Sequence, residues 1–209
     1  MKLIIFGATG MVGKQLVQQA LFGKNQVKAF GRNVYTTDYL ETENLELVQG
    51  ALFDEDEVYH AIKDCDAVIS AIGGSMDGID KTRTLGMKNI IKQMQKAGVK
   101  RIVAIGGLGV LNADENSLLI DKEDYPAEYK AVGFEHKKAF ELLNESGLDW
   151  TFVCPPGIIN EGPTGTYVTK ANYPPEENKY KINAGDLAMF MLKELKKNEY
   201  VKQKVGISN

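Results

Sequence analysis

An apolar strand that runs directly into three glycines is the feature that most constrains the fold of this chain. Residues 2–6 read Lys-Leu-Ile-Ile-Phe, and Gly7, Gly10 and Gly13 follow at three-residue spacing. Gly7 allows a sharp turn, Gly10 a close approach of the backbone to a pyrophosphate, and Gly13 close packing of the next helix. A glycine triplet also suits any strand-to-helix turn. Its place between a strand and an amphipathic helix favours a dinucleotide-binding turn.

Strand-like and helix-like segments alternate along the chain. This alternation predicts a doubly wound parallel sheet with helices on both faces, a Rossmann-type α/β fold. The length of 209 residues suits a single domain over residues 1–209. The expected strands are 2–6, 27–30, 45–48, 67–71, 101–105, 151–154 and 201–207, and the expected helices are 11–21, 56–62, 81–96, 133–145 and 187–196.

Two longer segments interrupt this rhythm. Residues 108–132 form an acidic stretch, and residues 155–180 are rich in proline and glycine. Both follow late strands, so they should lie at the carboxyl ends of those strands, where open α/β sheets bind ligands. We expect them to form the walls of a substrate site, and ordinary surface loops are the alternative.

The composition of the chain limits the kinds of binding partner that we expect. A formal net charge of −3 gives no overall basic field, so we expect no nucleic-acid partner. The longest apolar runs are strand-sized, which predicts neither a membrane span nor a signal peptide. Cys65 and Cys154 form no C-x-x-C pair, as expected for reduced thiols in a cytoplasmic protein. His60 and His136 do not have ligand spacing, so we expect no metal site. We expect a monomer or a small homo-oligomer.

Arg32 follows the second expected strand, about twenty residues beyond the glycine turn. An acidic residue there would accept a hydrogen bond from the 2′-hydroxyl of NAD, whereas an arginine suits the 2′-phosphate of NADP. No acidic residue lies between Gly31 and Thr37, and only three arginines occur in the chain. We therefore expect NADP(H) in preference to NAD(H), with a solvated surface arginine as the alternative.

Small residues at successive strand ends should contact the cofactor. Each glycine could be a simple turn residue, but their occurrence at several carboxyl ends predicts one extended binding edge. The nicotinamide should lie beside residues 105–106 and 155–158. The predicted cofactor-binding residues are Gly7, Thr9, Gly10, Met11, Val12, Arg32, Asn33, Leu52, Ala71, Ile72, Gly73, Ile105, Gly106, Pro155, Gly157 and Ile158.

Three segments together resemble the atypical short-chain dehydrogenase/reductase family with NAD(P)H-binding domains. They are Gly-Ala-Thr-Gly-Met-Val-Gly at 7–13, Asp-Ala-Val-Ile at 66–69 and Ser-Gly-Leu-Asp-Trp-Thr-Phe-Val-Cys-Pro-Pro-Gly at 146–157. Residues 155–158, 163–167 and 185–191 resemble the branch of biliverdin-IXβ reductase, also called flavin reductase. The resemblance implies an NADPH-dependent reductase with a broad, aromatic-tolerant pocket for flavins, tetrapyrroles or quinone-like molecules.

The chain departs from the family's catalytic pattern. The usual serine falls at Gly107, and the usual Tyr-x-x-x-Lys pair falls at Val132 and His136. The family's proton-donating hydroxyls are therefore absent at these positions. Ala51 stands where the family often has an aspartate near the adenine.

His136 is the candidate catalytic residue. With an unperturbed pKa near 6.5, its imidazole could hydrogen-bond the nicotinamide ribose or donate a proton at neutral pH, and a packing or surface role is the alternative. Tyr125, Tyr129 and Tyr167 are expected in the substrate wall, although core packing would explain each of them equally well.

Two functions follow from these features. The first is an NADPH-dependent reductase that transfers hydride to a planar conjugated acceptor, a flavin, quinone or tetrapyrrole-like molecule, without a Ser-Tyr-Lys set. The second is a non-catalytic NADP(H)-binding redox sensor that acts through a protein partner. Turnover with such acceptors would discriminate the two.

Overall fold

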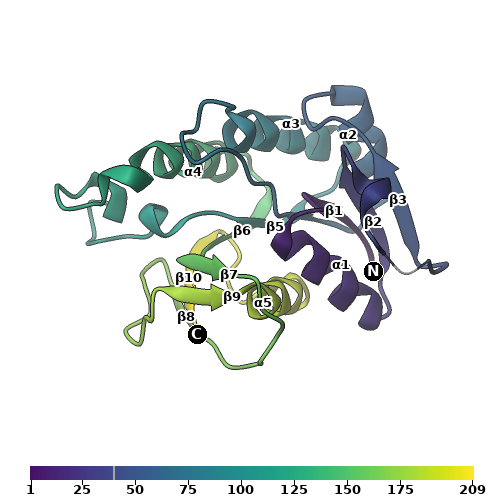
Figure 1. The fold of residues 1–209 in the computed structure, drawn as a ribbon. Helices are drawn as coiled ribbons and strands as arrows, with labels where there is room; N and C mark the ends of the chain where they lie inside the picture. The colour runs from purple at the N-terminus through teal and green to yellow at the C-terminus, as the bar shows by residue number, and fades with distance from the viewer. Residues whose placement is uncertain (40) are drawn as a thin grey trace.

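The central sheet contains most of the strands that the sequence pattern predicts. The computed structural model describes residues 1–39 and 41–209, and its main sheet has eight strands. They are β1 (Lys2–Phe6), β2 (Gln26–Gly31), β3 (Leu45–Gln49), β4 (Ala67–Ser70), β5 (Arg101–Ile105), β6 (Asp149–Cys154), β8 (Val168–Ala171) and β10 (Gln203–Ser208). Their order in space is β3-β2-β1-β4-β5-β6-β10-β8 (Figure 1).

The direction of these strands identifies the fold. All neighbouring pairs from β3 to β10 are parallel, and β8 is antiparallel to β10. The chain extends outward from β1 to β3 on one side and from β4 to β6 on the other, so the topological switch point lies between β1 and β4. The predicted Rossmann-type doubly wound fold is confirmed, with an antiparallel edge strand in addition.

Helices cover both faces of the sheet (Figure 1). One face carries α2 (Glu55–Ile62), α3 (Thr82–Ala97) and α4 (Ala127–Glu145), and the other carries α1 (Met11–Phe22) and α5 (Ala184–Lys197). Short 3₁₀ turns occur at Val34–Thr36, Leu108–Val110 and Leu119–Asp121. Within the described residues, none of the helices combines the length and the apolar character needed to traverse a bilayer.

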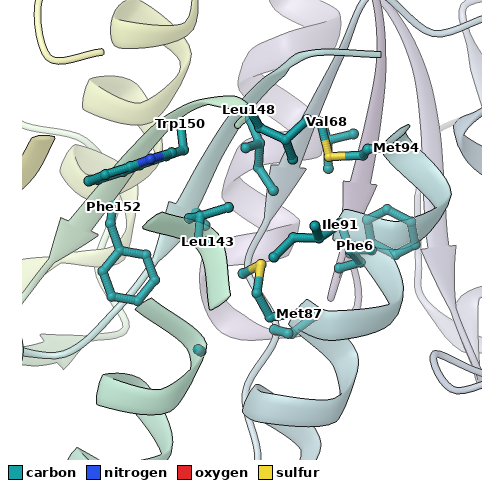
Figure 2. Close-up of a cluster of buried hydrophobic side chains, with 14 of the residues drawn as sticks. Phe6, Val68, Met87, Ile91, Met94, Leu143, Leu148, Trp150 and Phe152 are labelled. Carbon is teal, nitrogen blue, oxygen red and sulfur yellow. The ribbon is translucent and has the colours of Figure 1, made fainter. Parts of the chain in front are cut away.

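Two hydrophobic cores hold these layers together. The strands β1 and β4 are buried along nearly their whole length, because helices lie on both of their faces. Phe6, Met87 and Trp150 belong to the core under α2, α3 and α4 (Figure 2). Trp150 and Phe152 point to the same face of β6, and the ring of Phe140 lies 5.6 Å from that of Trp150.

Local sequence signals set two helix ends. Asp54 accepts a hydrogen bond from the Glu57 backbone N–H at 2.9 Å and so caps α2, as the Asp-x-x-Glu spacing predicts. Gly98 ends α3 in the left-handed region, with φ of 73°.

The structure corrects the two interrupting segments. The helix expected at 133–145 begins at Ala127, so residues 127–132 are helical rather than loop. The segment 155–180 contains β8 and the three-residue strand β7 (Gly157–Ile159), which pairs with β9 (Lys181–Asn183) in a separate parallel ribbon. Strands this short depend on partners distant in sequence, and local periodicity does not reveal them. The ribbon fixes the wall at residues 157–159 against the residues that lead into α5.

Candidate cofactor and acceptor site

The glycine turn brings β1, β4 and α1 into contact at the switch point. Gly7 has φ of +76°, and a Cβ on it would lie 2.3 Å from the carbonyl oxygen of Ala71. A Cβ on Gly13 would lie 2.0 Å from the carbonyl oxygen of Gly7. Both positions therefore require glycine. Gly10 precedes α1 without a side-chain cap, and no acidic residue lies in the first turn. The exposed N–H groups of this helix end fit a pyrophosphate.

The end of β2 offers a free cation. Arg32 is exposed, and its guanidinium forms no hydrogen bond or ion pair with any other described residue. Asn33 is also exposed, and the methyl group of Thr9 packs against Gly31, where a Cβ would lie 3.2 Å away. These residues fit a phosphorylated ribose bound next to the glycine turn.

Tyr39 reaches the same turn, a contact that no local sequence signal indicates. Its hydroxyl donates a hydrogen bond to the carbonyl oxygen of Ala8 at 2.6 Å. Burial raises the pKa of Tyr39 to about 12, so the phenol remains protonated at neutral pH. The segment that follows Arg32 is thereby tied to the glycine turn.

Backbone groups just after β3 already have hydrogen-bond partners within the protein. The Ala51 N–H donates to the Glu57 carboxylate at 2.6 Å, so this backbone donor has a partner before any cofactor binds. The carbonyl oxygen of Leu52 accepts from Asn89 at 2.9 Å, and the Leu52 side chain packs on Gly86, where a Cβ would lie 2.4 Å from it. Leu52 is therefore held as a fixed apolar surface at this edge.

A cavity of about 760 Å³ opens at the carboxyl ends of β5 and β6. Both interrupting segments contribute to its walls, as expected. Of the predicted site residues, those that line it are Gly106, Tyr125, Tyr129, His136, Pro155, Gly157 and Ile158. The other predicted cofactor residues are found outside this cavity, along the carboxyl edge from β1 to β5: Gly7, Thr9, Gly10, Met11, Val12, Arg32, Asn33, Leu52, Ala71, Ile72, Gly73 and Ile105.

Glycines form the floor of the cavity. A Cβ on Gly106 would lie 2.2 Å from the ring of Phe152, and one on Gly107 would lie 2.7 Å from the imidazole of His136. The positions that match the family's serine and lysine are therefore neighbours in space. The imidazole occupies the volume that a side chain at position 107 would need.

Tyr125, from the segment 108–132, also lines the cavity. The Tyr125 oxygen lies 2.5 Å from the position of a Cβ on Gly109 and 3.4 Å from that of a Cβ on Gly133. Burial raises the pKa of Tyr125, with a smaller contribution from Tyr129, so the phenol is neutral at physiological pH.

Comparison with known proteins identifies the family. The family described as NAD(P)H-binding matches residues 7–198. This chain belongs to it. Within it the chain is an NAD(P)H-dependent oxidoreductase of the atypical short-chain dehydrogenase/reductase type, as the sequence resemblance implies.

Individual relatives of this oxidoreductase carry varied names. It is 30% identical over 174 residues to the uncharacterized sugar epimerase YhfK of Bacillus subtilis, covering 79% of this chain and 76% of that protein. A protein from Burkholderia pseudomallei, provisionally named as exported, superposes with a TM-score of 0.85 at 31% identity over the full length of both chains. One from Streptococcus pneumoniae, provisionally named an NADH-flavin reductase, gives 0.84 at 26% identity and covers 100% of this chain and 99% of that one.

The pKa of His136 in this oxidoreductase departs from the unperturbed value near 6.5. The side chain lines the cavity and is half-buried. Burial, and secondarily the positive charge of Arg83, lower the pKa of His136 to about 3. At neutral pH the ring is uncharged, so it can form hydrogen bonds but cannot serve as an imidazolium acid.

Tyr167 is not in the cavity wall of this oxidoreductase. Its ring packs edge-on against Phe190 of α5 at 5.9 Å, on the other face of the sheet. The turn just before it is held by Asp186, which accepts hydrogen bonds from the Thr164 and Gly165 backbone N–H groups at 2.8 and 2.7 Å. The wall of the cavity therefore contains Tyr125 and Tyr129 but not Tyr167.

Some lining residues were not among the individual residues predicted for the oxidoreductase. Met76 and Arg83 come from the loop after β4 and the start of α3, outside both interrupting segments, and Tyr180 ends the second segment just before β9. For Arg83 a signal existed, because arginine is scarce in this lysine-rich chain. Tyr180 falls within the expected wall segment 155–180, whereas Met76 carries no sequence signal that separates it from a surface residue.

Proposed function

We propose that this oxidoreductase reduces a planar conjugated acceptor, a flavin, a quinone or a tetrapyrrole-like molecule, with NADPH as the reductant. The observation that carries the proposal is the cavity of about 760 Å³ with apolar and aromatic walls, which opens directly on Gly106 and residues 155–158. These are the segments where we expect the nicotinamide. An acceptor in the cavity would lie face to face with that ring.

The chain's own residues account for binding of the cofactor. The uncapped start of α1 and the glycine turn suit the pyrophosphate, and the free guanidinium of Arg32 suits a 2′-phosphate, which supports a preference for NADP(H). Pro155 and Ile158 offer a rigid apolar surface, held in place by the β7–β9 pairing. When bound, a reduced nicotinamide supplies the hydride.

The acceptor site matches molecules that need little acid catalysis. Gly107 has no hydroxyl, and His136 is uncharged at neutral pH. A conjugated acceptor delocalises the incoming charge itself, so orientation against the walls can supply most of the rate. Tyr125 provides a neutral phenol that can hydrogen-bond a carbonyl or ring nitrogen of the acceptor.

The test combines cofactor binding with turnover. Purified protein is incubated with NADPH and a panel of FMN, riboflavin, quinones and biliverdin, while the absorbance of the reduced nicotinamide is followed. We expect oxidation of NADPH with at least one acceptor and a lower KM for NADPH than for NADH. Tight NADPH binding without turnover of any acceptor would contradict the proposal and favour the non-catalytic sensor.

A further inference from the structure

Arg83 is a buried cation of the cavity wall that has no carboxylate in contact with it among the described residues. It is the second residue of α3, and only 8% of its surface is exposed. Its Nη1 donates to the carbonyl oxygen of Ser75 at 3.0 Å and its Nη2 to that of Gly74 at 3.1 Å. No other described residue forms an ion pair with it, and its buried Nε has no hydrogen-bond partner among them. The hydrogen bonds of the guanidinium within the described residues are therefore to two neutral carbonyls.

The nearby carboxylates are engaged elsewhere. Asp80 accepts from the backbone N–H groups of Ser75 at 2.8 Å and Thr82 at 3.1 Å, which orders the loop before α3. Glu135 accepts from the Thr84 hydroxyl at 2.8 Å and pairs with Lys81 at 3.3 Å. Both carboxylates act on Arg83 only from beyond contact distance, and burial outweighs them in lowering its pKa.

A buried charge without a counter-charge in contact destabilises the folded protein. Such a charge is therefore expected where a ligand of opposite charge binds. Removal of a guanidinium from water costs several kcal/mol unless an anion or a full set of hydrogen bonds compensates. Two of the five N–H donors of Arg83 are used within the described residues, and three are not. The planar arrangement of these donors matches a carboxylate or a phosphate.

We propose that Arg83 binds an anionic substituent, a carboxylate or phosphate, of the acceptor. Arg83 lines the same cavity as Tyr125, His136 and Pro156, whereas the residues suited to the cofactor's pyrophosphate and 2′-phosphate lie outside it. Lys122, the other cation of the lining, is already paired with Asp114 at 2.5 Å. The inference rests on the proposed function, because it takes the cavity as the acceptor site. It narrows the acceptors to conjugated molecules that carry a negative charge beside the reducible ring.

The test uses pairs of acceptors with the same conjugated ring system, of which one member lacks the anionic group: FMN against riboflavin and biliverdin against its dimethyl ester. Binding is measured by flavin fluorescence or tetrapyrrole absorbance, in the presence of NADP and without turnover. In the wild-type protein we expect the anionic member of at least one pair to bind about 10–100-fold more tightly. Arg83→Met should remove this preference, and Arg83→Lys should retain part of it because it keeps the charge. Lys122→Met is the matched control and should leave the ratio within about twofold.

The outcomes separate the two proposals. Equal binding of charged and neutral members of both pairs by the wild-type protein would overturn the role of Arg83 without any variant. If Arg83→Met instead weakens NADPH binding and leaves the acceptor ratio unchanged, the anion is a phosphate of the cofactor and the inference is wrong. A clear preference for the anion in a protein that oxidises no NADPH would support the role of Arg83 and contradict the reductase. Melting temperatures close to that of the wild type show that the variants remain folded.

Discussion

Two arginines at opposite edges of the sheet have different surroundings. Arg101, at the amino end of β5, pairs with the Glu194 carboxylate at 2.8 Å and donates to the Thr151 hydroxyl at 2.9 Å. Glu194 in turn accepts from the Tyr200 backbone N–H at 3.0 Å. Arg83, near the carboxyl edge, has backbone carbonyls alone. The Arg101 side chain is 12% exposed and has a carboxylate in contact, whereas Arg83 is buried and has no carboxylate in contact within the described part of the chain.

This difference separates structural from ligand-binding roles. At the amino edge Arg101 and Glu194 form an ion pair that joins α5 to β5 and β6, although the Arg101 Nε, like that of Arg83, has no hydrogen-bond partner among the described residues. At the carboxyl edge the guanidinium of Arg32, three donors of Arg83 and the uncapped start of α1 have no partner among the described residues. Cations without a contacting carboxylate therefore lie at the edge where a dinucleotide and an acceptor are expected.

The largest effect should come from breaking the amino-edge pair. Arg101→Met leaves the Glu194 carboxylate buried without its cation, which should lower the free energy of unfolding by about 3–5 kcal/mol. For a chain of this size the melting temperature should fall by about 6–20 °C. Affinity for NADPH, measured well below the melting temperature, should stay within about twofold.

Arg83→Met is the matched comparison for stability. Because it removes a buried charge that has no contacting carboxylate, its melting temperature should fall much less than that of Arg101→Met, or rise. Equal losses in the two variants would mean that both arginines are structural, and the contrast between the edges would fail.

A smaller effect in binding alone is expected at the exposed end of β2. Arg32→Ala should weaken NADPH binding by about 1–3 kcal/mol, because a charge-assisted contact with the 2′-phosphate is lost. NADH affinity and the melting temperature should not change, since Arg32 is exposed and unpaired within the described residues. Titration calorimetry with both dinucleotides measures the difference. A parallel loss for NADH would remove the 2′-phosphate from the interpretation.

His136, at the carboxyl edge of the sheet, should make the free energy of unfolding depend on pH. Its pKa of about 3 in the folded state lies below the ordinary value of 6.5, so between these values the unfolded chain binds a proton that the folded chain does not. Stability is therefore complete above pH 6.5 and falls as the pH is lowered toward 3. On going from pH 7.5 to 5.5, the wild type should lose about 1 kcal/mol more than His136→Gln.

The exposed histidine provides the control for that titration. His60→Gln should retain the wild-type loss, because the His60 ring is exposed on α2. If thermal unfolding at the two pH values shows the same loss in the wild type and in His136→Gln, the imidazole is not buried uncharged.

Much of the fold could be predicted because its signals are local. The run Lys2–Phe6, the glycines at 7, 10 and 13 and the cap at Asp54 each act within a few residues of sequence, and the structure has those elements at nearly the expected bounds. The strands β7 and β9 exist only because they pair across more than twenty residues. The start of α4 at Ala127 was missed because Tyr125-Pro126 and the acidic residues nearby suggested a loop.

For the candidate site too, features set by nearby residues could be predicted from the sequence, and features set by residues distant in the sequence could not. Motif position located the glycine turn and Arg32, and it aligned Gly107 with His136, which the fold brings together. The charge state of His136 depends on burial and on Arg83, which is more than fifty residues away in the sequence. Whether Arg83 has a counter-charge is likewise a property of the assembled structure, because Asp80 is close in sequence yet directed to backbone N–H groups.

The smallest predicted effect concerns Tyr39, whose hydroxyl already has a hydrogen-bond partner at the carboxyl edge of the sheet. Tyr39 donates to the Ala8 carbonyl at 2.6 Å and so fixes the segment after Arg32 against the glycine turn. Tyr39→Phe should cost about 0.5–1.5 kcal/mol of stability, the net value of one hydrogen bond. It should also raise the Kd for NADPH several-fold, because the turn and the 2′-phosphate site are no longer held in register. Tyr35→Phe, which removes an exposed hydroxyl bonded to Leu47 in the same segment, should change neither. An unchanged Kd for Tyr39→Phe would show that the hydrogen bond from Tyr39 to Ala8 has a structural role only. The binding site would then be indicated only by groups that have no partner within the described residues.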